Sequence, residues 1–233
     1  MQPTQLQYLK ALGIDVWVDR NMPSLESAVE NQSILNESAE QAASSKLRTL
    51  EKQVAKCTAC VLHESRTQTV YGVGNANADW LIIGEAPGAE EDKQGEPFVG
   101  RAGLLLNDML KAIDLSREEI YIANILKCRP PNNRDPRLEE AQACENFLKK
   151  QITLIKPKII LCVGRIAAQN LLKDETPIGK MRGQRYVYAD TDTDTNIPVV
   201  VTYHPAYLLR SPKEKRKSWE DLKMAVKIFN GES

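Results

Sequence analysis

Short apolar runs alternate with longer amphipathic segments over the C-terminal two thirds of this chain. Four apolar runs have the length of buried strands: Trp80–Ile83, Tyr121–Ile125, Lys158–Val163 and Pro198–Thr202. Three segments of helical periodicity lie between them: Gly103–Ile113, Arg137–Ile155 and Arg165–Leu172. Apolar strands that alternate with helices are typical of a parallel sheet buried on both faces. We therefore predict an α/β fold, a three-layer α/β/α sandwich around a short, four-stranded parallel sheet, to which Gln184–Tyr188 adds a strand or hairpin arm.

The N-terminal part of the chain has a different pattern. Gln5–Trp17 carries leucine or valine at positions 6, 9, 12 and 16, which predicts a short amphipathic helix. Arg20–Gln41 is polar and is interpreted as a flexible linker or, equally well, as a disordered tail without a role. A further helix is expected over Ser45–Lys56. The predicted organisation is a helical and linker extension over residues 1–44 and one globular domain over residues 45–233.

Composition and charge narrow the class of protein. Of the 233 residues 42% are hydrophobic, and no apolar run reaches membrane-spanning length. Met1–Leu12 lacks the basic and apolar regions of a signal peptide, so we expect a cytoplasmic protein, monomeric and without membrane attachment. The 31 basic residues are balanced by 31 acidic ones, unlike a histone-type binder. A nucleic-acid partner would therefore need a local basic face.

Polar residues and glycines follow the predicted strands at the ends where parallel sheets bind ligands. Gly84-Glu-Ala-Pro-Gly88 follows the first strand, Asn124 the second, Gly164-Arg165 the third and His204 the fourth. Each has a structural alternative. A lone His204 is more often a satisfied structural side chain, Glu85 could cap a helix, and Asn124 could occupy a turn. Only their gathering at one sheet edge predicts an active site.

The cysteines suggest a metal centre. Cys57 and Cys60 form a C-x2-C pair, and Cys128 and Cys144 stand sixteen positions apart. Disulfides are disfavoured in a reducing compartment, and a close pair plus two distant thiolates suits either zinc or an iron–sulfur cluster. Cys162 lies inside an apolar run and is interpreted as a small buried hydrophobe.

Taken together, these residues resemble the family 4 uracil-DNA glycosylases, the iron–sulfur branch of that superfamily. The resemblance runs from about Cys57 to Met224 and rests on ordered blocks: Cys57-x-x-Cys60, Gly84-Glu-Ala-Pro-Gly88 with Glu91-Asp92, Gly95-Glu-Pro-Phe-Val-Gly-Arg-Ala-Gly103, Asn124-Ile-Leu-Lys-Cys-Arg-Pro-Pro131, Cys144, and His204-Pro-Ala-Tyr-Leu-Leu-Arg210. It implies a uracil-DNA glycosylase-like fold and a structural [4Fe–4S] cluster held by Cys57, Cys60, Cys128 and Cys144. It also implies excision of uracil from DNA in base excision repair, with an abasic site as product.

The resemblance gives the reaction a set of candidate catalytic residues. Hydrolysis of the N-glycosidic bond places positive charge on the sugar and negative charge on uracil, so that catalysis needs a donor aimed at uracil O2. We expect His204 to be that donor, in either its neutral or its protonated form. Glu85 is expected to orient the attacking water or stabilise the sugar cation. Related families carry an aspartate where this chain has Ala86, which favours electrostatic catalysis over a general base.

Four further residues are expected to bind uracil. Asn124 can accept from N3–H and donate to O4, which rejects cytosine because cytosine offers the opposite pattern. Phe98 is expected to stack on the flipped ring, its alternative being a core aromatic. Gly84 is placed beside the base by the motif. Glu91 resembles the family residue that crowds C5 and excludes thymine.

The expected DNA contacts lie on basic and apolar positions near the C-terminus. Leu208 and Leu209 are predicted to wedge into the gap that the flipped base leaves. Arg210 is expected to meet phosphates. The run Lys213–Lys217 could do so too, or could be a solvated helix start, and Arg182 belongs to a candidate phosphate loop. Both single- and double-stranded uracil-containing DNA are expected to be substrates.

Three other functions are open to such a sequence. A related branch that traps uracil covalently carries Gln at the position of Ala86 and an additional histidine, whereas His63 here lies beside the first cysteine pair. A catalytically silent DNA-binding module would not need Glu85, Asn124 and His204 together. An iron–sulfur electron carrier would leave the strand-end residues unexplained.

Overall fold

A six-stranded sheet runs through the computed structural model, which describes residues 41–190 and 195–232 of the chain. The strands follow the order β1-β3-β2-β4-β6-β5. Their bounds are β1 Val73–Gly74, β2 Trp80–Gly84, β3 Ile120–Asn124, β4 Ile159–Val163, β5 Arg185–Asp190 and β6 Thr195–Thr202. Strands β3, β2, β4 and β6 are parallel, whereas β1 and β5 pair antiparallel at the edges. The predicted parallel sheet and the additional strand after residue 184 are confirmed, and β1 extends the sheet further.

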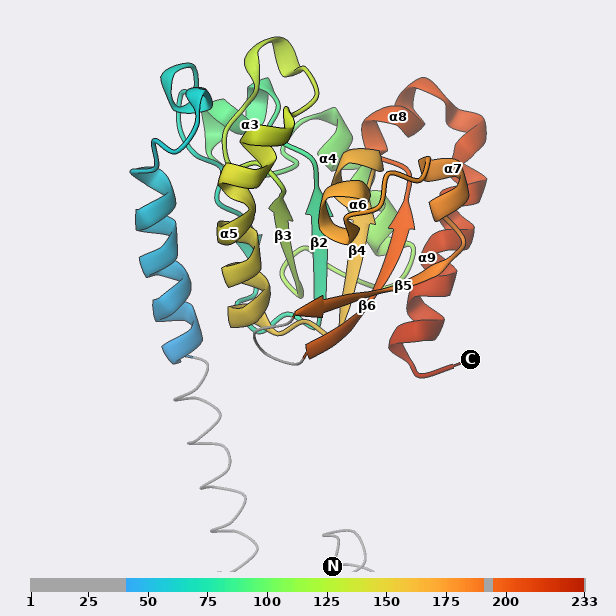
Figure 1. Ribbon diagram of the computed structural model, residues 1–233. Helices are drawn as coiled ribbons and strands as arrows, with labels where there is room; N and C mark the ends of the chain where they lie inside the picture. The colour runs from blue at the N-terminus through green and yellow to red at the C-terminus, as the bar shows by residue number, and fades with distance from the viewer. Residues whose placement is uncertain (1–40, 191–194, 233) are drawn as a thin grey trace, which may run out of the picture. The chain divides into compact units, whose positions relative to one another are not determined.

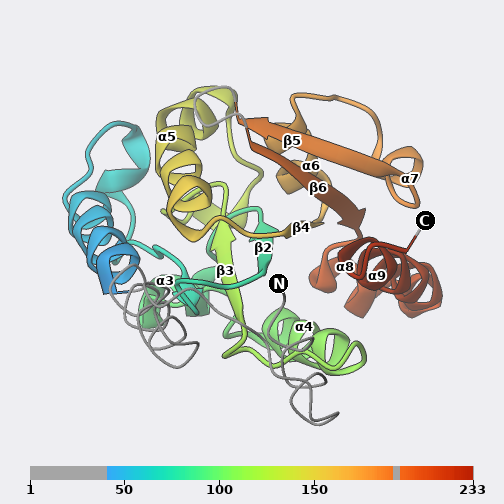
Figure 2. The same cartoon turned by 90° about the horizontal axis from the view of Figure 1, so that it is seen from below.

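Helices cover both faces of the sheet (Figures 1 and 2). The α-helices are α3 Ala89–Gln94, α4 Arg101–Lys111, α5 Leu138–Ile155, α6 Arg165–Leu172, α7 Ile178–Met181, α8 Pro205–Arg210 and α9 Lys215–Phe229, with a further helix over residues 41–55. Three 3-10 turns complete the elements: η1 Val61–Glu64, η2 Pro131–Asn133 and η3 Pro212–Glu214. The predicted helices over 45–56, 103–113, 137–155 and 165–172 are confirmed, each within a few residues.

Alternating side chains of the strands divide the core into two halves. In β2, Leu81 and Ile83 pack into a cluster with buried residues of α5, α6 and the helix over 41–55. Trp80 and Ile82 point the other way and pack with buried residues of α4 and α9. Successive residues of a strand face opposite sides of a sheet, so a continuous apolar run fills both layers. This arrangement confirms the predicted α/β/α sandwich.

Two segments of the chain are not covered by these confirmed predictions. The predicted helix over Gln5–Trp17 and the linker up to residue 40 lie outside the described residues, so the division at residues 44 and 45 stays a prediction. The segment from Pro205 to Arg210, for which the sequence pattern predicted no helix, forms α8, with His204 at its N-cap. Among the helices that the structure describes, none has both the length and the apolar character required to cross a membrane.

Candidate active site

A cavity of about 430 Å³ opens at the carboxyl ends of the parallel strands. It brings together most of the residues that were predicted for catalysis and base binding, with one predicted phosphate contact, Arg210. The catalytic and base-binding residues that line it are Glu85, Glu91, Phe98, Asn124 and His204. These residues come from the ends of β2 and β3, from α3, from the loop before α4, and from α8 and its N-cap. The four candidate cluster cysteines line a separate cavity. The predicted gathering of these residues at one edge of the sheet is therefore confirmed, because parallel strands end at the same edge.

His204 is held in one tautomer by its own helix. Its Nδ1 accepts a hydrogen bond of 3.1 Å from the backbone N–H of Ala206. A backbone N–H can only donate, so Nδ1 carries no proton and the proton of the neutral ring is on Nε2. Burial, assisted by Arg210, lowers the pKa of His204 to about 4, against a smaller opposing effect of Glu91. The imidazole is therefore neutral at pH 7 and presents an N–H donor.

Two residues that line the cavity, Asn124 and Phe98, pack so tightly against position 84 that only glycine fits there. A Cβ on Gly84 would come within 2.4 Å of Asn124 Oδ1 and 2.7 Å of the Phe98 ring. Phe98 itself has a φ of +56° and is 7% exposed, and its ring stacks on His204 with centroids 5.6 Å apart. Phe98 both belongs to the core cluster and lines the cavity, so the two alternatives for it are compatible.

Glu91 has a contact that the sequence did not predict. Its Oε1 accepts hydrogen bonds of 3.1 Å from the backbone N–H groups of Val99 and Gly100. It thereby ties α3 to the loop that carries Phe98 and to the N-cap of α4. The expected contact with C5 of the base stays a prediction. A carboxylate bound to two backbone donors has a fixed position, which that role also requires.

Glu85 is a partly buried carboxyl beside a second carboxylate that sequence reasoning missed. Burial and, to a smaller extent, the charge of Asp135 raise the pKa of Glu85 to about 7, with Arg165 opposing both effects. Asp135 lines the cavity and forms an ion pair of 2.6 Å with Arg165, the first residue of α6. Arg165 directly follows a predicted strand, but its partner Asp135 lies thirty residues earlier in an irregular segment that no sequence pattern marks.

The four cysteines expected to hold a cluster lie together. Cys57, Cys60, Cys128 and Cys144 all line one small cavity, whereas Cys162 is fully buried in β4. Donors already point at the sulfurs: the Arg66 guanidinium lies 3.1 Å from Cys128 Sγ, and the Lys127 backbone N–H lies 3.3 Å from Cys144 Sγ. Within the described residues, no group of three or more His, Cys, Asp or Glu side chains is arranged to hold a single metal ion.

Comparison with known proteins decides the family. The model of the Uracil DNA glycosylase superfamily matches residues 71–223. A Type-4 uracil-DNA glycosylase from Archaeoglobus fulgidus is 45% identical over 176 residues, which cover 74% of this chain and 87% of the relative. Another from Thermotoga maritima is 42% identical over 186 residues, covering 78% and 94%. The chain belongs to the type-4 uracil-DNA glycosylases. The family predicted from the sequence motifs is confirmed.

In this member of the family the two leucines expected to form an apolar wedge differ in exposure. Leu208 is 1% exposed and packs into the core, so its prediction as an exposed wedge is wrong. Leu209 is 36% exposed and Tyr207 37% exposed, and Tyr207 also lines the cavity. The reason is helical geometry: successive residues of α8 rotate by about 100°, so the middle residue of the three points inward.

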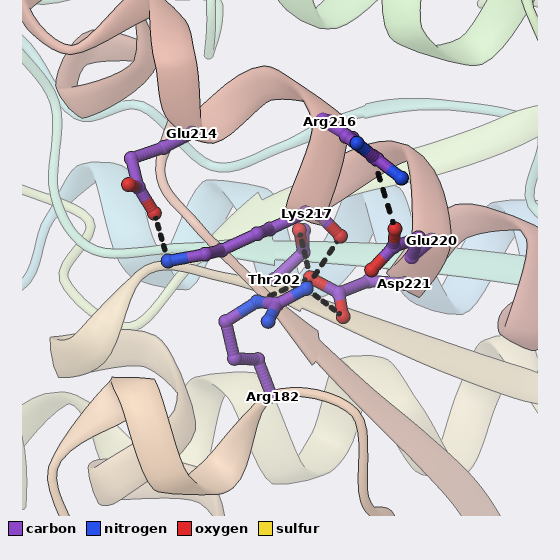
Figure 3. Close-up of polar contacts among 7 residues, drawn as sticks. All are labelled: Arg182, Thr202, Glu214, Arg216, Lys217, Glu220 and Asp221. Carbon is purple, nitrogen blue, oxygen red and sulfur yellow. Dashed lines mark hydrogen bonds and ion pairs between the residues drawn. The ribbon is translucent and has the colours of Figure 1, made fainter.

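Arg182, expected in a phosphate loop, is already paired inside the protein. Its guanidinium makes two hydrogen bonds to Asp221 of α9, of 2.9 and 3.1 Å, and a third to the carbonyl of Lys217 (Figure 3). Asp221 in turn accepts from Thr202 at the end of β6, and the guanidinium covers the ring of Tyr203. The expectation that Arg182 contacts DNA stays a prediction, for a guanidinium that Asp221 already pairs inside the protein. Sequence spacing gave no sign of this partner.

Proposed function

We propose that this protein excises uracil from DNA by hydrolysing the N-glycosidic bond and leaves an abasic site, as a step of base excision repair. The observation that carries the proposal is the convergence of Glu85, Phe98, Asn124 and His204 on one cavity. Its volume of about 430 Å³ is sufficient for a single base with its sugar, not for a duplex. The target nucleotide must therefore leave the base stack before it reacts.

Asn124 reads the base and Phe98 stacks on it. With its Oδ1 accepting from N3–H and its Nδ2 donating to O4, Asn124 matches uracil and opposes cytosine. The tight packing of its amide against Gly84 supports a fixed orientation. A fixed amide discriminates because the wrong base leaves buried polar groups unpaired. Glu91, anchored by two backbone donors, is proposed to crowd C5 and exclude thymine.

His204 stabilises the leaving group. The neutral ring, with its proton on Nε2, donates to uracil O2 as negative charge develops there. The ring does not need to transfer a proton, because a preorganised donor in a water-poor site lowers the barrier by itself. The bond from Ala206 N–H to Nδ1 supports this assignment, since it fixes both the tautomer and the ring orientation.

Glu85 supplies negative charge next to the sugar. Its carboxylate would stabilise the cationic sugar and orient the attacking water. Because the pKa of Glu85 is about 7, the charged form is fully present only in mildly alkaline solution. Position 86 is an alanine, so no second carboxylate follows Glu85 in the motif. Asp135 lines the same cavity and acts on the charge of Glu85 through space.

The cavity lacks the amine that strand cleavage would need. A lyase forms a Schiff base between an amine and the sugar. Among the described residues that line the cavity none is a lysine. Lys127, the lysine of the strand-end motifs, is 1% exposed and donates both its side-chain hydrogen bonds inside the protein. The enzyme therefore stops at the abasic site and leaves the backbone uncut.

The four cysteines are proposed to hold a [4Fe–4S] cluster. They line one cavity, and four Cys thiolates are a ligand set that such a cluster uses. Cys57, Cys60, Cys128 and Cys144 would hold it, and Arg66 and the Lys127 N–H would bond to the ligand sulfurs. When bound, the cluster would cross-link the segments that carry these cysteines. We give it a structural role and no chemical step.

DNA contacts are proposed for the exposed residues near the cavity mouth. Leu209 and Tyr207 are exposed on α8, and either can fill the gap left by a flipped base. Arg210 lines the cavity mouth and would meet a phosphate. Because the contacts centre on one flipped base, we propose both single-stranded and double-stranded DNA as substrates. We also propose that the enzyme is a monomer and acts in the cytoplasm.

One oligonucleotide assay tests the proposal. A labelled strand with a single uracil is incubated with wild type, Glu85→Ala and His204→Ala, and is then treated with alkali. Wild type should yield a cleaved strand only after alkali. His204→Ala should lose roughly a hundred- to thousandfold in turnover while DNA binding persists. An inactive, iron-replete wild type would support the silent binding module instead, and cleavage without alkali would disprove the monofunctional mechanism.

A further inference from the structure

Lys127 is a buried lysine whose partners join two functional parts of the molecule. Its side chain is 1% exposed, and within the described part of the chain it forms no ion pair with a carboxylate. Nζ donates to the backbone oxygen of Asn124 at 2.8 Å and to Gln151 Oε1 at 2.6 Å. The backbone N–H of Lys127 lies 3.3 Å from Cys144 Sγ. One residue thus contacts the base-reading residue and a cluster ligand.

Both partners of Lys127 on α5 lie on the same face of that helix. Cys144 and Gln151 are seven residues apart, which is two turns, and both are buried. Gln151 donates onward to the carbonyl of Tyr71 and to the hydroxyl of Tyr121 on β3. The carbonyl of Lys127 accepts from Val70 N–H at 2.8 Å. The residue is therefore held by its backbone and by its side chain, which leaves it little freedom to move.

A lysine in this position needs a reason other than stability. Burying a charged or strongly polar group costs free energy that an apolar side chain of similar size avoids. What Lys127 adds is a hydrogen bond to the carbonyl at the end of β3, beyond which the chain leaves the sheet. The orientation of that peptide sets the direction of the Asn124 side chain. A Cβ at Gly84 would lie only 2.4 Å from Asn124 Oδ1, so small shifts of this side chain matter.

We propose that Lys127 is a positioning residue, which fixes Asn124 against α5, the helix that carries the cluster ligand Cys144. The proposal rests on the base-reading role given to Asn124 above. It adds a physical connection by which the cluster site acts on uracil recognition: Cys144 and Gln151 hold Lys127, and Lys127 holds Asn124. Misplacing a recognition group by about 1 Å costs roughly a hundredfold in rate, so this short chain of contacts has a measurable effect.

The test is a double-mutant cycle between Lys127 and Asn124. Lys127→Met removes the donor and keeps an unbranched side chain of similar size. With full iron content, it should weaken binding of free uracil and lower kcat/KM on a uracil oligonucleotide, each by roughly ten- to a hundredfold. In an Asn124→Ala background the same change should cost less than about twofold, because Lys127 would no longer have a side chain to position. Lys150→Met, an exposed lysine on α5, is the matched control and should match wild type.

Several results would overturn the proposal. Equal losses from Lys127→Met in both backgrounds would show a general structural role, and wild-type uracil binding in iron-replete Lys127→Met would remove any role. If that variant loses iron, Gln151→Met takes its place. It should weaken uracil binding less than Lys127→Met is expected to, and only where Asn124 is present. An unchanged uracil affinity in Gln151→Met would contradict the proposal. An inactive wild type would instead refute the proposed glycosylase function, so the two failures are distinguishable.

Discussion

Replacing Glu85 by Gln should make the protein more stable and less active. The perturbation exchanges a partly buried carboxyl for a neutral amide of nearly the same shape. Burial and Asp135 raise the pKa of Glu85 from 4.5 to about 7, so ionising it in the folded protein costs free energy. This group therefore contributes most stability below pH 4.5, and the contribution is lost as the pH rises through about 7.

The size of the effect follows from the shift. A difference of about 2.5 pKa units corresponds to roughly 3 kcal/mol once the carboxyl is fully ionised, and about 1 kcal/mol of this is already lost at pH 5. Glu85→Gln avoids the loss. Its free energy of unfolding should exceed that of wild type by about 3 kcal/mol at pH 8.5 but only about 1 kcal/mol at pH 5. For a domain of this size that is a rise in Tm of roughly 6–12 °C at pH 8.5.

Thermal unfolding of iron-replete protein, followed by far-UV circular dichroism at both pH values, measures this difference. Glu90→Gln, an exposed carboxylate on α3, is the control and should change Tm by no more than 1–2 °C, because exposed ion pairs contribute about 0.5 kcal/mol. Activity should respond in the opposite direction. Glu85→Gln should lose roughly a hundredfold in kcat/KM. An equal Tm shift at pH 5 and pH 8.5 would refute the reasoning, because it would show that Glu85 does not titrate between them.

The remaining predictions concern acidity, specificity, the core and the cluster. Because Glu85 acts charged, kcat/KM of wild type should rise with pH through about 7 and then stay level, as His204 titrates only near 4; a flat profile would contradict this. Arg182→Met should lower the free energy of unfolding by about 3–5 kcal/mol by leaving its 1%-exposed carboxylate partner unpaired, against less than about 1 kcal/mol for the exposed Arg216→Met, both measured by urea denaturation. Asn124→Asp should slow uracil release, since a carboxylate cannot donate to O4; an unchanged rate would place base reading elsewhere. Cys144→Ser should reduce the iron content of the purified protein, whereas Cys162→Ser should leave it unchanged.

Much of the fold and of the site could be predicted from the chain because both rest on local patterns. The apolar runs from residue 80 onward specify buried strands, and strand direction follows from the helices between them. Once the strands are parallel, Glu85, Asn124 and His204 must gather at one edge, far apart though they are in sequence. The spacing of Cys57, Cys60, Cys128 and Cys144 likewise predicted a shared metal site. Spacing alone did not distinguish zinc from an iron–sulfur cluster.

What the sequence by itself determined is which residues stand at the strand ends, and hence the family, the reaction and its candidate groups. Only the tertiary structure decided what each charged or apolar side chain does there. Leu208 is buried because α8 is a helix and places that side chain on its inner face. Arg182 pairs with Asp221, which lies thirty-nine residues further along the chain. The charge of Asp135 acts on Glu85, and Lys127 donates hydrogen bonds to both Asn124 and Gln151. Such partners depend on which surfaces pack together in the folded chain. A long polar side chain pairs with a group that packing brings within about 3 Å, and no local sequence pattern encodes that proximity.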